Sequence, residues 1–181
     1  SMRPDYAGVC GITKEEMLTA MSDYIDDFAE AQEITREEAI EGLKRQYDGY
    51  HFTWPSPDVF NPFSLLNAFQ DHDYTNYWFS SGTPTYLIEM LRKFNVVPSK
   101  IGGASVLASA FDAPTENMKS ITPLLYQSGY ITIKDYNRAA KLYTLDIPNT
   151  EIRVGLMDSL LPNYVERRKE AGNTTIAKMY L

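Results

Sequence analysis

Apolar residues recur at intervals of three or four in two stretches near the start of the chain. They are Met17, Met21, Ile25 and Phe28 in the first stretch, and Ile40, Leu43 and Tyr47 in the second. Thr13 and Thr35 precede these stretches, and each is followed three residues later by a glutamate. This spacing is typical of a capping box, in which hydroxyl and carboxylate satisfy two free helix amides. The pattern predicts two amphipathic helices, ending near Ala31 and Tyr47, with Asp48-Gly49 breaking the second.

The hydrophobic pattern changes around the loop "WPSPD", residues 54–58. Its two prolines forbid helix and favour extended neighbours, so short extended pieces are predicted over 50–53 and 59–60. Asn61-Pro62 and Thr83-Pro84 each combine an N-cap residue with proline at the first helical position, which predicts two further helices. The residues expected to face inward from these helices are Leu65, Leu66, Phe69, Leu87, Ile88 and Leu91.

The last third of the chain predicts a compact unit of helix, hairpin and helix. Residues 121–127 form an apolar helical stretch closed by Gly129, and the alternation over 130–136 is typical of a half-buried strand. A second strand over 142–145 completes a hairpin, and Asn149 then caps a helix. The inward residues of that helix are Ile152, Leu156 and Leu160. The predicted fold class is mainly α with small β, a helical subdomain followed by a winged-helix-like unit with a β-hairpin.

Residues 100–119 are rich in small side chains and carry little periodicity, so they contain the predicted boundary between two subdomains. Ser1-Met2 looks like a cloning remnant, and the abrupt start after it suggests an excised segment of a longer protein. The predicted division is a tag remnant and linker over 1–11, a helical subdomain over 12–100, a winged-helix-like subdomain over 101–165, and the start of a linker to a downstream domain over 166–181.

Composition and charge narrow the classes of partner. With 44% hydrophobic and 23% charged side chains, the 181 residues have the make-up of an ordinary globular protein. The net charge of -7 argues against a polyphosphate partner, because counterion release needs clustered cations. The 17 Lys and Arg are instead scattered among 24 acids. Nucleic acid is therefore a possible partner that the charge does not support.

Cysteine usage and hydropathy bear on the compartment. Cys10 is the single cysteine, which excludes a disulfide within the chain and a cysteine-based metal site and fits a reducing compartment. No apolar run approaches the roughly twenty residues that span a bilayer, and no secretory leader opens the sequence. We therefore expect a cytoplasmic protein with no membrane partner.

The familiar catalytic motifs are missing from the sequence. It contains neither a Gly-x-x-x-x-Gly-Lys-Ser/Thr phosphate loop, nor a Gly-x-Ser-x-Gly elbow, nor a His-Glu-x-x-His pair. "DHD", residues 71–73, supplies three potential metal ligands, but consecutive residues point apart, which favours a solvated loop. His51 is interpreted as a core histidine bonded to a carbonyl and Cys10 as a passive thiol. We expect no catalytic residue and no metal site in this chain.

The predicted hairpin carries Lys134, Arg138 and Lys141, which are candidate nucleic-acid contacts of a winged helix. The preceding helix offers no Arg or Lys to read bases and the surrounding charge is acidic, so a packing or protein-contact role is favoured. The nucleic-acid alternative needs a positive patch that the folded chain gathers from Lys134, Arg138, Lys141, Arg167, Arg168 and Lys169.

An ordered series of blocks is more specific than any of these motifs. The blocks are "CGITKEEM", "YDGYHF", "VFNPFSLLNAF", "NYWFSSGTPTYLIEMLRK", "PLLYQSGYITIKDYN" and "LYTLDIPNTEIRVGL". They resemble the predicted AAA-ATPase-like family of bacterial proteins, from Cys10 to about Tyr164. Members of that family typically carry an amino-terminal P-loop ATPase core, and many end in a PD-(D/E)XK nuclease-like domain. The resemblance implies that this chain is the region between them, a lid-type helical subdomain and the winged-helix-like unit, with neither catalytic centre.

The resemblance gives a second meaning to Gly82-Thr83-Pro84. In related P-loop ATPases a Gly-x-Pro motif begins a helix of the lid, and its proline can pack on the adenine. A plain capped helix start explains these three residues equally well. Tyr50 and His51 of "YDGYHF" are further candidates to lie near nucleotide. Together with Trp54, they are the few residues of this aromatic-rich region that we expect to face a ligand or the ATPase core. Most aromatics of this region are expected to build the core.

The implied function is a non-catalytic lid and transmission segment, which senses nucleotide on an absent core and couples it to a downstream effector. The segment needs no cofactor of its own, while ATP and Mg²⁺ are expected for a parent ATPase with possible nuclease activity. The expected partners are the protein's own N-terminal ATPase core and C-terminal domain. The alternatives are a nucleic-acid-binding adaptor for a nuclease domain, and a protein-interaction module that uses exposed aromatics around Trp54 and Trp78.

Overall fold

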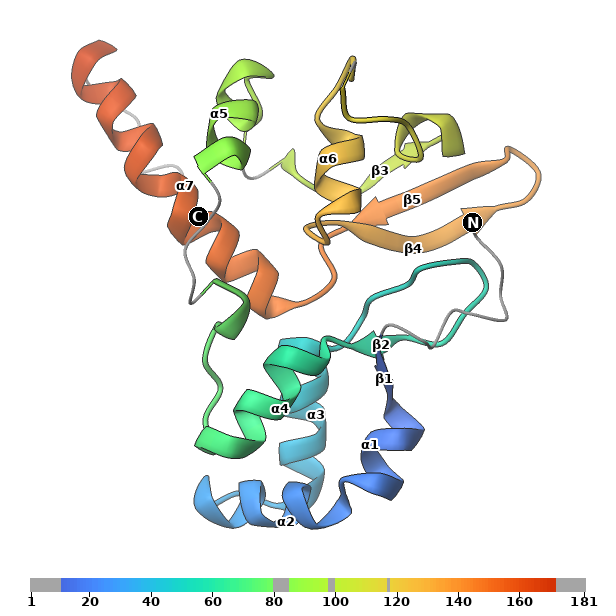
Figure 1. Cartoon of the computed structure of the whole chain (residues 1–181), viewed down its shortest axis with the longest axis vertical. Helices are drawn as coiled ribbons and strands as arrows, with labels where there is room; N and C mark the ends of the chain where they lie inside the picture. The colour runs from blue at the N-terminus through green and yellow to red at the C-terminus, as the bar shows by residue number, and fades with distance from the viewer. Residues whose placement is uncertain (1–10, 80–84, 98–99, 117, 172–181) are drawn as a thin grey trace.

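A computed structural model describes residues 11–79, 85–97, 100–116 and 118–171, with side chains described as far as Leu160 in the last helix (Figure 1). The fold is mainly α with small antiparallel β-sheets, as the sequence predicts. Within the described ranges, none of the helices combines the length and the apolar character needed to cross a membrane.

The chain begins with a short strand and three helices. They are β1 (Ile12–Thr13), α1 (Lys14–Ala20), α2 (Ser22–Ala31) and α3 (Arg36–Tyr47). Both capping boxes are confirmed, because the hydroxyls of Thr13 and Thr35 each accept a backbone N–H three residues on, at 3.2 Å. The prediction of a single first helix was wrong, because the helix is interrupted at Met21, which separates α1 from α2. The Thr19 hydroxyl, two residues before the break, donates to the Glu15 carbonyl at 2.8 Å, a bond that often bends helices.

The proline-containing loop leads into β2 (Val59–Phe60), which pairs antiparallel with β1. The extended piece predicted over 50–53 was wrong except at Tyr50, which forms one isolated bridge to Val59. Helix α4 (Pro62–Asp71) begins as predicted, with Asn61 as its N-cap. Its core face consists of Leu65, Ala68 and Phe69, whereas Leu66 is 49% exposed and does not face inward.

The rest of the chain builds a second small sheet and its covering helices. The elements are η2 (Tyr77–Phe79), α5 (Thr85–Lys93), β3 (Ala104–Val106), η4 (Ala108–Ala110), α6 (Thr122–Gln127), β4 (Thr132–Asn137), β5 (Leu142–Asp146) and α7 (Thr150–Ala171). The predicted hairpin is β4 and β5, and Asn149 caps α7 by accepting from the Ile152 amide at 3.1 Å. Strand β3 pairs with the outer edge of β5, which gives an antiparallel order β3-β5-β4 that sequence reasoning missed.

The start of β4 is buried on both faces rather than half-buried, because Thr132 and Ile133 are both sequestered from solvent. Ile133 enters the core, while the Thr132 hydroxyl is covered by the backbone of His51. The prediction of simple alternation was wrong here because a loop from the first half of the chain covers the second face.

Two hydrophobic cores divide the fold. The first is built by α1–α4 together with Phe60 of β2, which we call the helical unit, and its largest buried side chains include Phe28, Tyr47 and Phe60. The second belongs to α5, α6, α7 and the three-stranded sheet, which we call the sheet unit. Figure 1 shows the two units one above the other, with β1 and β2 between them. Helix α5, which the sequence grouped with the first subdomain, contributes Leu87 and Leu91 to the second core.

Candidate functional site

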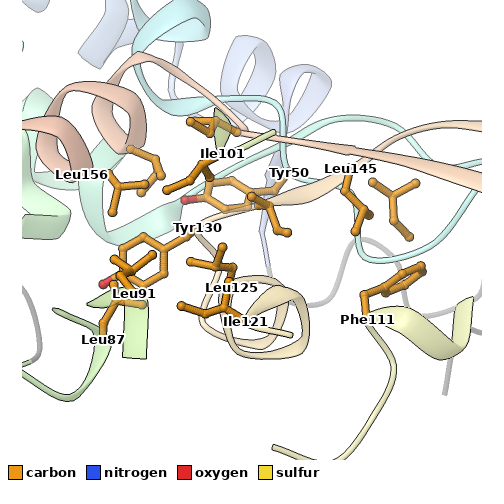
Figure 2. Close-up of a cluster of buried hydrophobic side chains, with 14 of the residues drawn as sticks. Tyr50, Leu87, Leu91, Ile101, Phe111, Ile121, Leu125, Tyr130, Leu145 and Leu156 are labelled. Carbon is orange, nitrogen blue, oxygen red and sulfur yellow. The ribbon is translucent and has the colours of Figure 1, made fainter. Parts of the chain in front are cut away.

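The turn after α3 belongs to both cores. Tyr47, the last residue of α3, is buried in the helical unit, whereas Tyr50 is buried in the sheet unit. Figure 2 shows the Tyr50 ring among Tyr130, Leu125 and Ile101. Residues 48–51, which we call the junction turn, therefore carry the chain from one core into the other within the "YDGYHF" block.

Hydrogen bonds from the sheet unit hold the backbone of the junction turn. The Lys134 ammonium donates to the carbonyls of Gly49 at 2.5 Å and Pro148 at 3.2 Å. The Asn149 side-chain amide donates to the Asp48 carbonyl at 3.0 Å. The Thr132 hydroxyl accepts from the His51 amide and donates to the His51 carbonyl, both at 2.8 Å. Strand β4 and the start of α7 are thereby fixed to the end of α3.

Gly49 is required at this turn for two reasons. Its φ of +98° lies in a region that L side chains rarely adopt. A Cβ atom there would lie 2.4 Å from the Pro148 carbonyl oxygen and 2.7 Å from Lys134 Nζ. The close approach of the two backbones, and the lysine that joins them, therefore depend on the missing side chain.

Burial perturbs the ionisable groups around the junction turn. Loss of hydration raises the pKa of Asp48 to about 6, although the Gly49 N–H that donates to its Oδ1 at 2.8 Å opposes the rise. Loss of hydration also lowers the pKa of Lys134, and the nearby carboxylates of Asp58 and Asp48 partly offset that change. A buried carboxylate and a partly buried ammonium thus influence each other electrostatically where the two units join.

His51 and Asp58 extend this cluster toward solvent. His51 Nδ1 lies 3.1 Å from Asp58 Oδ1, without the alignment of a hydrogen bond, and Asp58 is half exposed. Burial lowers the pKa of His51, while the Asp58 carboxylate opposes the change. The His51 ring is buried, as predicted, and its close neighbour is this carboxylate.

Two surface hollows, of about 640 and 390 Å³, adjoin the junction turn. Lys44, Asp48 and Asp58 line both of them, so each hollow carries mixed charge. In the part of the chain that the structure describes, no three His, Cys, Asp or Glu side chains are grouped as metal ligands. The arrangement holds the two packed units together through hydrogen bonds, and those from Lys134 are strongest when its amine is protonated.

Glu151 forms a second buried tie between the units. It is fully buried in the first turn of α7, and its Oε1 accepts from the Ser64 hydroxyl at 2.9 Å and the Trp78 amide at 2.8 Å. Burial raises the pKa of Glu151, and these hydrogen bonds oppose the rise. Its place at a helix N-terminus favours the negative charge. Sequence reasoning missed this residue, because an acid two positions after an N-cap is ordinary.

The structure brings some of the predicted site residues together and separates others. Tyr50, His51 and Lys134 meet at the junction turn. Arg138 and Lys141 are exposed at the tip of the hairpin, apart from Lys134, whose ammonium binds backbone carbonyls. Gly82, Thr83 and Pro84 lie outside the described residues, and so do the side chains of Arg167, Arg168 and Lys169.

The "DHD" segment is an exposed helix end. His72 is the left-handed C-cap of α4, and its carbonyl accepts from the Gln32 side-chain amide at 2.5 Å. Asp73 accepts from the Tyr74 amide and the Thr75 hydroxyl. These bonds agree with the predicted solvated loop.

Comparison with known proteins identifies a relative of this chain. The chain is 31% identical over 165 residues to an uncharacterised protein in the vnfD 5′ region of Azotobacter chroococcum mcd 1. The match covers 88% of this chain but spans only 29% of the length of the relative. No family profile matches the chain, and no solved structure matches it.

Proposed function

We propose that this chain is the non-catalytic lid and transmission segment of a P-loop AAA-like ATPase. In this proposal the segment senses nucleotide bound to an ATPase core and couples the nucleotide state to a downstream effector. The ordered resemblance of its blocks to the AAA-ATPase-like family supports the proposal, and the length of the Azotobacter relative is compatible with a segment of a larger protein. We also propose that the protein is cytoplasmic, because a single cysteine suits a reducing compartment.

The junction turn is the observation that carries the proposal. Transmission between two packed units requires a physical connection that both units bias, and a flexible linker supplies none. Here Tyr47 and Tyr50 are buried in different cores only three residues apart, and Lys134 and Asn149 bond the backbone between them. A displacement of α3 is therefore passed to β4 and α7.

The buried positions of Tyr50 and His51 define their roles in the proposal. Neither side chain has a large surface to offer a ligand, so they position the junction rather than touch nucleotide. Contact with the adenine is assigned to Gly82, Thr83 and Pro84, by resemblance. ATP and Mg²⁺ would be held by the ATPase core, and the partners of this segment would be that core and a C-terminal domain.

The test compares this chain with the full-length product of the gene that contains it. We expect no ATP turnover by residues 1–181, because the phosphate-binding loop supplies most nucleotide contacts. We expect the full-length protein to hydrolyse ATP, and its Pro84→Gly variant to bind ATP more weakly, measured by equilibrium titration. Steady ATP hydrolysis by this chain alone, or a full-length protein that binds no ATP, would overturn the proposal.

A further inference from the structure

The Glu151 carboxyl is bonded unevenly inside the contact that it ties together. Its Oε1 accepts from the Ser64 hydroxyl of α4 and from the Trp78 amide of η2. Its Oε2 is also buried, but it accepts no hydrogen bond from the described residues. One oxygen of a fully buried acid is therefore satisfied by two donors, while the other has none.

The surroundings of Glu151 supply no positive charge. None of the ion pairs that the described residues form includes it. Tyr47 of α3 and Tyr50 of the junction turn interact with it electrostatically, η2 carries the Tyr77 phenol, and α4 faces it with the neutral Ser64 hydroxyl. Burial raises the pKa of all three phenols, so they are uncharged at physiological pH. An ionised Glu151 is thus a buried charge without a counter-ion.

The two protonation states of Glu151 therefore differ in how well the closed structure holds them. A carboxylate loses far more hydration on burial than a neutral carboxyl. Loss of hydration raises the pKa of Glu151, although the hydrogen bonds from the Trp78 amide and the Ser64 hydroxyl oppose the rise. The closed structure consequently binds this proton more tightly than a structure in which water reaches the carboxyl.

Water can reach Glu151 only if the elements around it separate. Ser64 is as fully buried as Glu151 itself. One turn further along α7, Gly155 lies so close to η2 that an added Cβ would overlap the Phe79 ring. Hydration of the carboxyl therefore requires α4 or η2 to move away from the start of α7.

We propose that Glu151 is a proton-sensitive latch, in which the neutral carboxyl closes the contact of α7 with α4 and η2, and ionisation favours the opening of that contact. The latch contributes stability below the ordinary glutamate pKa of 4.5, and this stability is lost as pH rises through the raised pKa of the folded chain. The proposal concerns the packing of this chain alone, and it does not depend on the ATPase proposal.

Glu151→Gln and Glu37→Gln are a matched pair of variants. Glutamine has nearly the shape of glutamate, stays neutral at every pH, and still offers an acceptor to Ser64 and Trp78. Glu37 is the second residue of α3, as Glu151 is the second residue of α7, but Glu37 is exposed. The two variants thus make the same chemical change at the same helix position, once in the contact and once in solvent.

Hydrogen exchange of the Trp78 amide, corrected for its intrinsic pH dependence, reports the opening. At low pH, where Glu151 is neutral, Glu151→Gln should protect this amide as well as the unmodified chain does. As pH rises to about 8, the unmodified chain should lose protection relative to Glu151→Gln, and Glu37→Gln should follow the unmodified chain. Asp48 titrates in all three proteins, so its effect is common to them.

Ser64→Ala supplies a second test with a defined direction. It removes a donor that favours the carboxylate, so the titration of the Glu151 carboxyl carbon, followed by ¹³C NMR, should move to higher pH. Equal Trp78 protection in Glu151→Gln and the unmodified chain at every pH would overturn the proposal. A Glu151 carboxyl that titrates at the ordinary glutamate pKa, or a titration that Ser64→Ala leaves in place, would overturn it as well.

Discussion

The substitution Gly49→Ala perturbs the junction turn at one atom, and its cost can be worked out from the structure. An alanine with φ of +98° pays about 1–2 kcal/mol for a conformation that L residues avoid. Its Cβ would also lie 2.4 Å from the Pro148 oxygen and 2.7 Å from Lys134 Nζ, so the lysine must leave and its hydrogen bonds are lost. A hydrogen bond from a charged donor contributes about 1.5–3 kcal/mol. The expected loss is about 3 kcal/mol.

Gly103→Ala is the matched control. Gly103 also has a positive φ, of +69°, but no atom lies within 4 Å of the Cβ that alanine would add. It should lose only the conformational part, about 1 kcal/mol. Urea unfolding followed by tryptophan fluorescence measures both free energies, and similar slopes make them comparable. If Gly49→Ala cost no more than Gly103→Ala, the junction turn would not be the tight connection described above.

Two further substitutions test the charged groups of the junction. Lys134→Met should lower the free energy of unfolding by about 2 kcal/mol, because its hydrogen bonds to the junction turn are lost. Lys141→Met, at the exposed hairpin tip, should change that free energy by less than about 0.5 kcal/mol. Equal effects of the two substitutions in urea unfolding would show that Lys134 is an ordinary surface cation. Asp48→Asn tests the raised pKa of that carboxyl. Between the ordinary aspartate pKa of 3.8 and the folded value of about 6, the unfolded chain releases a proton that the folded chain retains. The unmodified chain therefore loses stability as pH rises through that window. The variant should lose less stability over this window than the unmodified chain, because Glu151, whose pKa burial also raises, still titrates in both proteins. Parallel profiles of unfolding free energy from about pH 4 to 8 would contradict the assignment.

Local signals explain which elements the sequence predicts correctly. Four N-cap residues were predicted correctly because each bonds a backbone amide two or three positions further along the chain, so a short stretch of sequence is enough to recognise it. They are Thr13, Thr35, Asn61 and Asn149. The break at Met21 was missed because the helical spacing of apolar residues continues through it. Strand β3 was missed because its Ala, Ser and Val are short and largely exposed, and only pairing with β5 defines it.

The site depends on contacts between residues far apart in sequence, and local sequence patterns do not predict such contacts. Lys134 looked like a cation of the hairpin, yet its ammonium binds a carbonyl 85 residues earlier in the chain. Glu151 looked like a common first-turn acid, yet it accepts from Ser64, 87 residues away. Tyr50 was correctly associated with an important block, but the block alone does not show that its two tyrosines enter different cores.

If the junction turn couples the helical unit and the sheet unit, the two units should open as one body. Native-state hydrogen exchange tests it most directly, through the amides of Leu43 in α3 and Leu156 in α7, each buried in its own core. We expect both amides to exchange through the same global opening, with opening free energies equal within roughly 1 kcal/mol, and we expect Gly49→Ala to separate the two values. If one amide of the unmodified chain exchanged through an independent opening, several kcal/mol below the other, the two units would not be coupled through the junction turn.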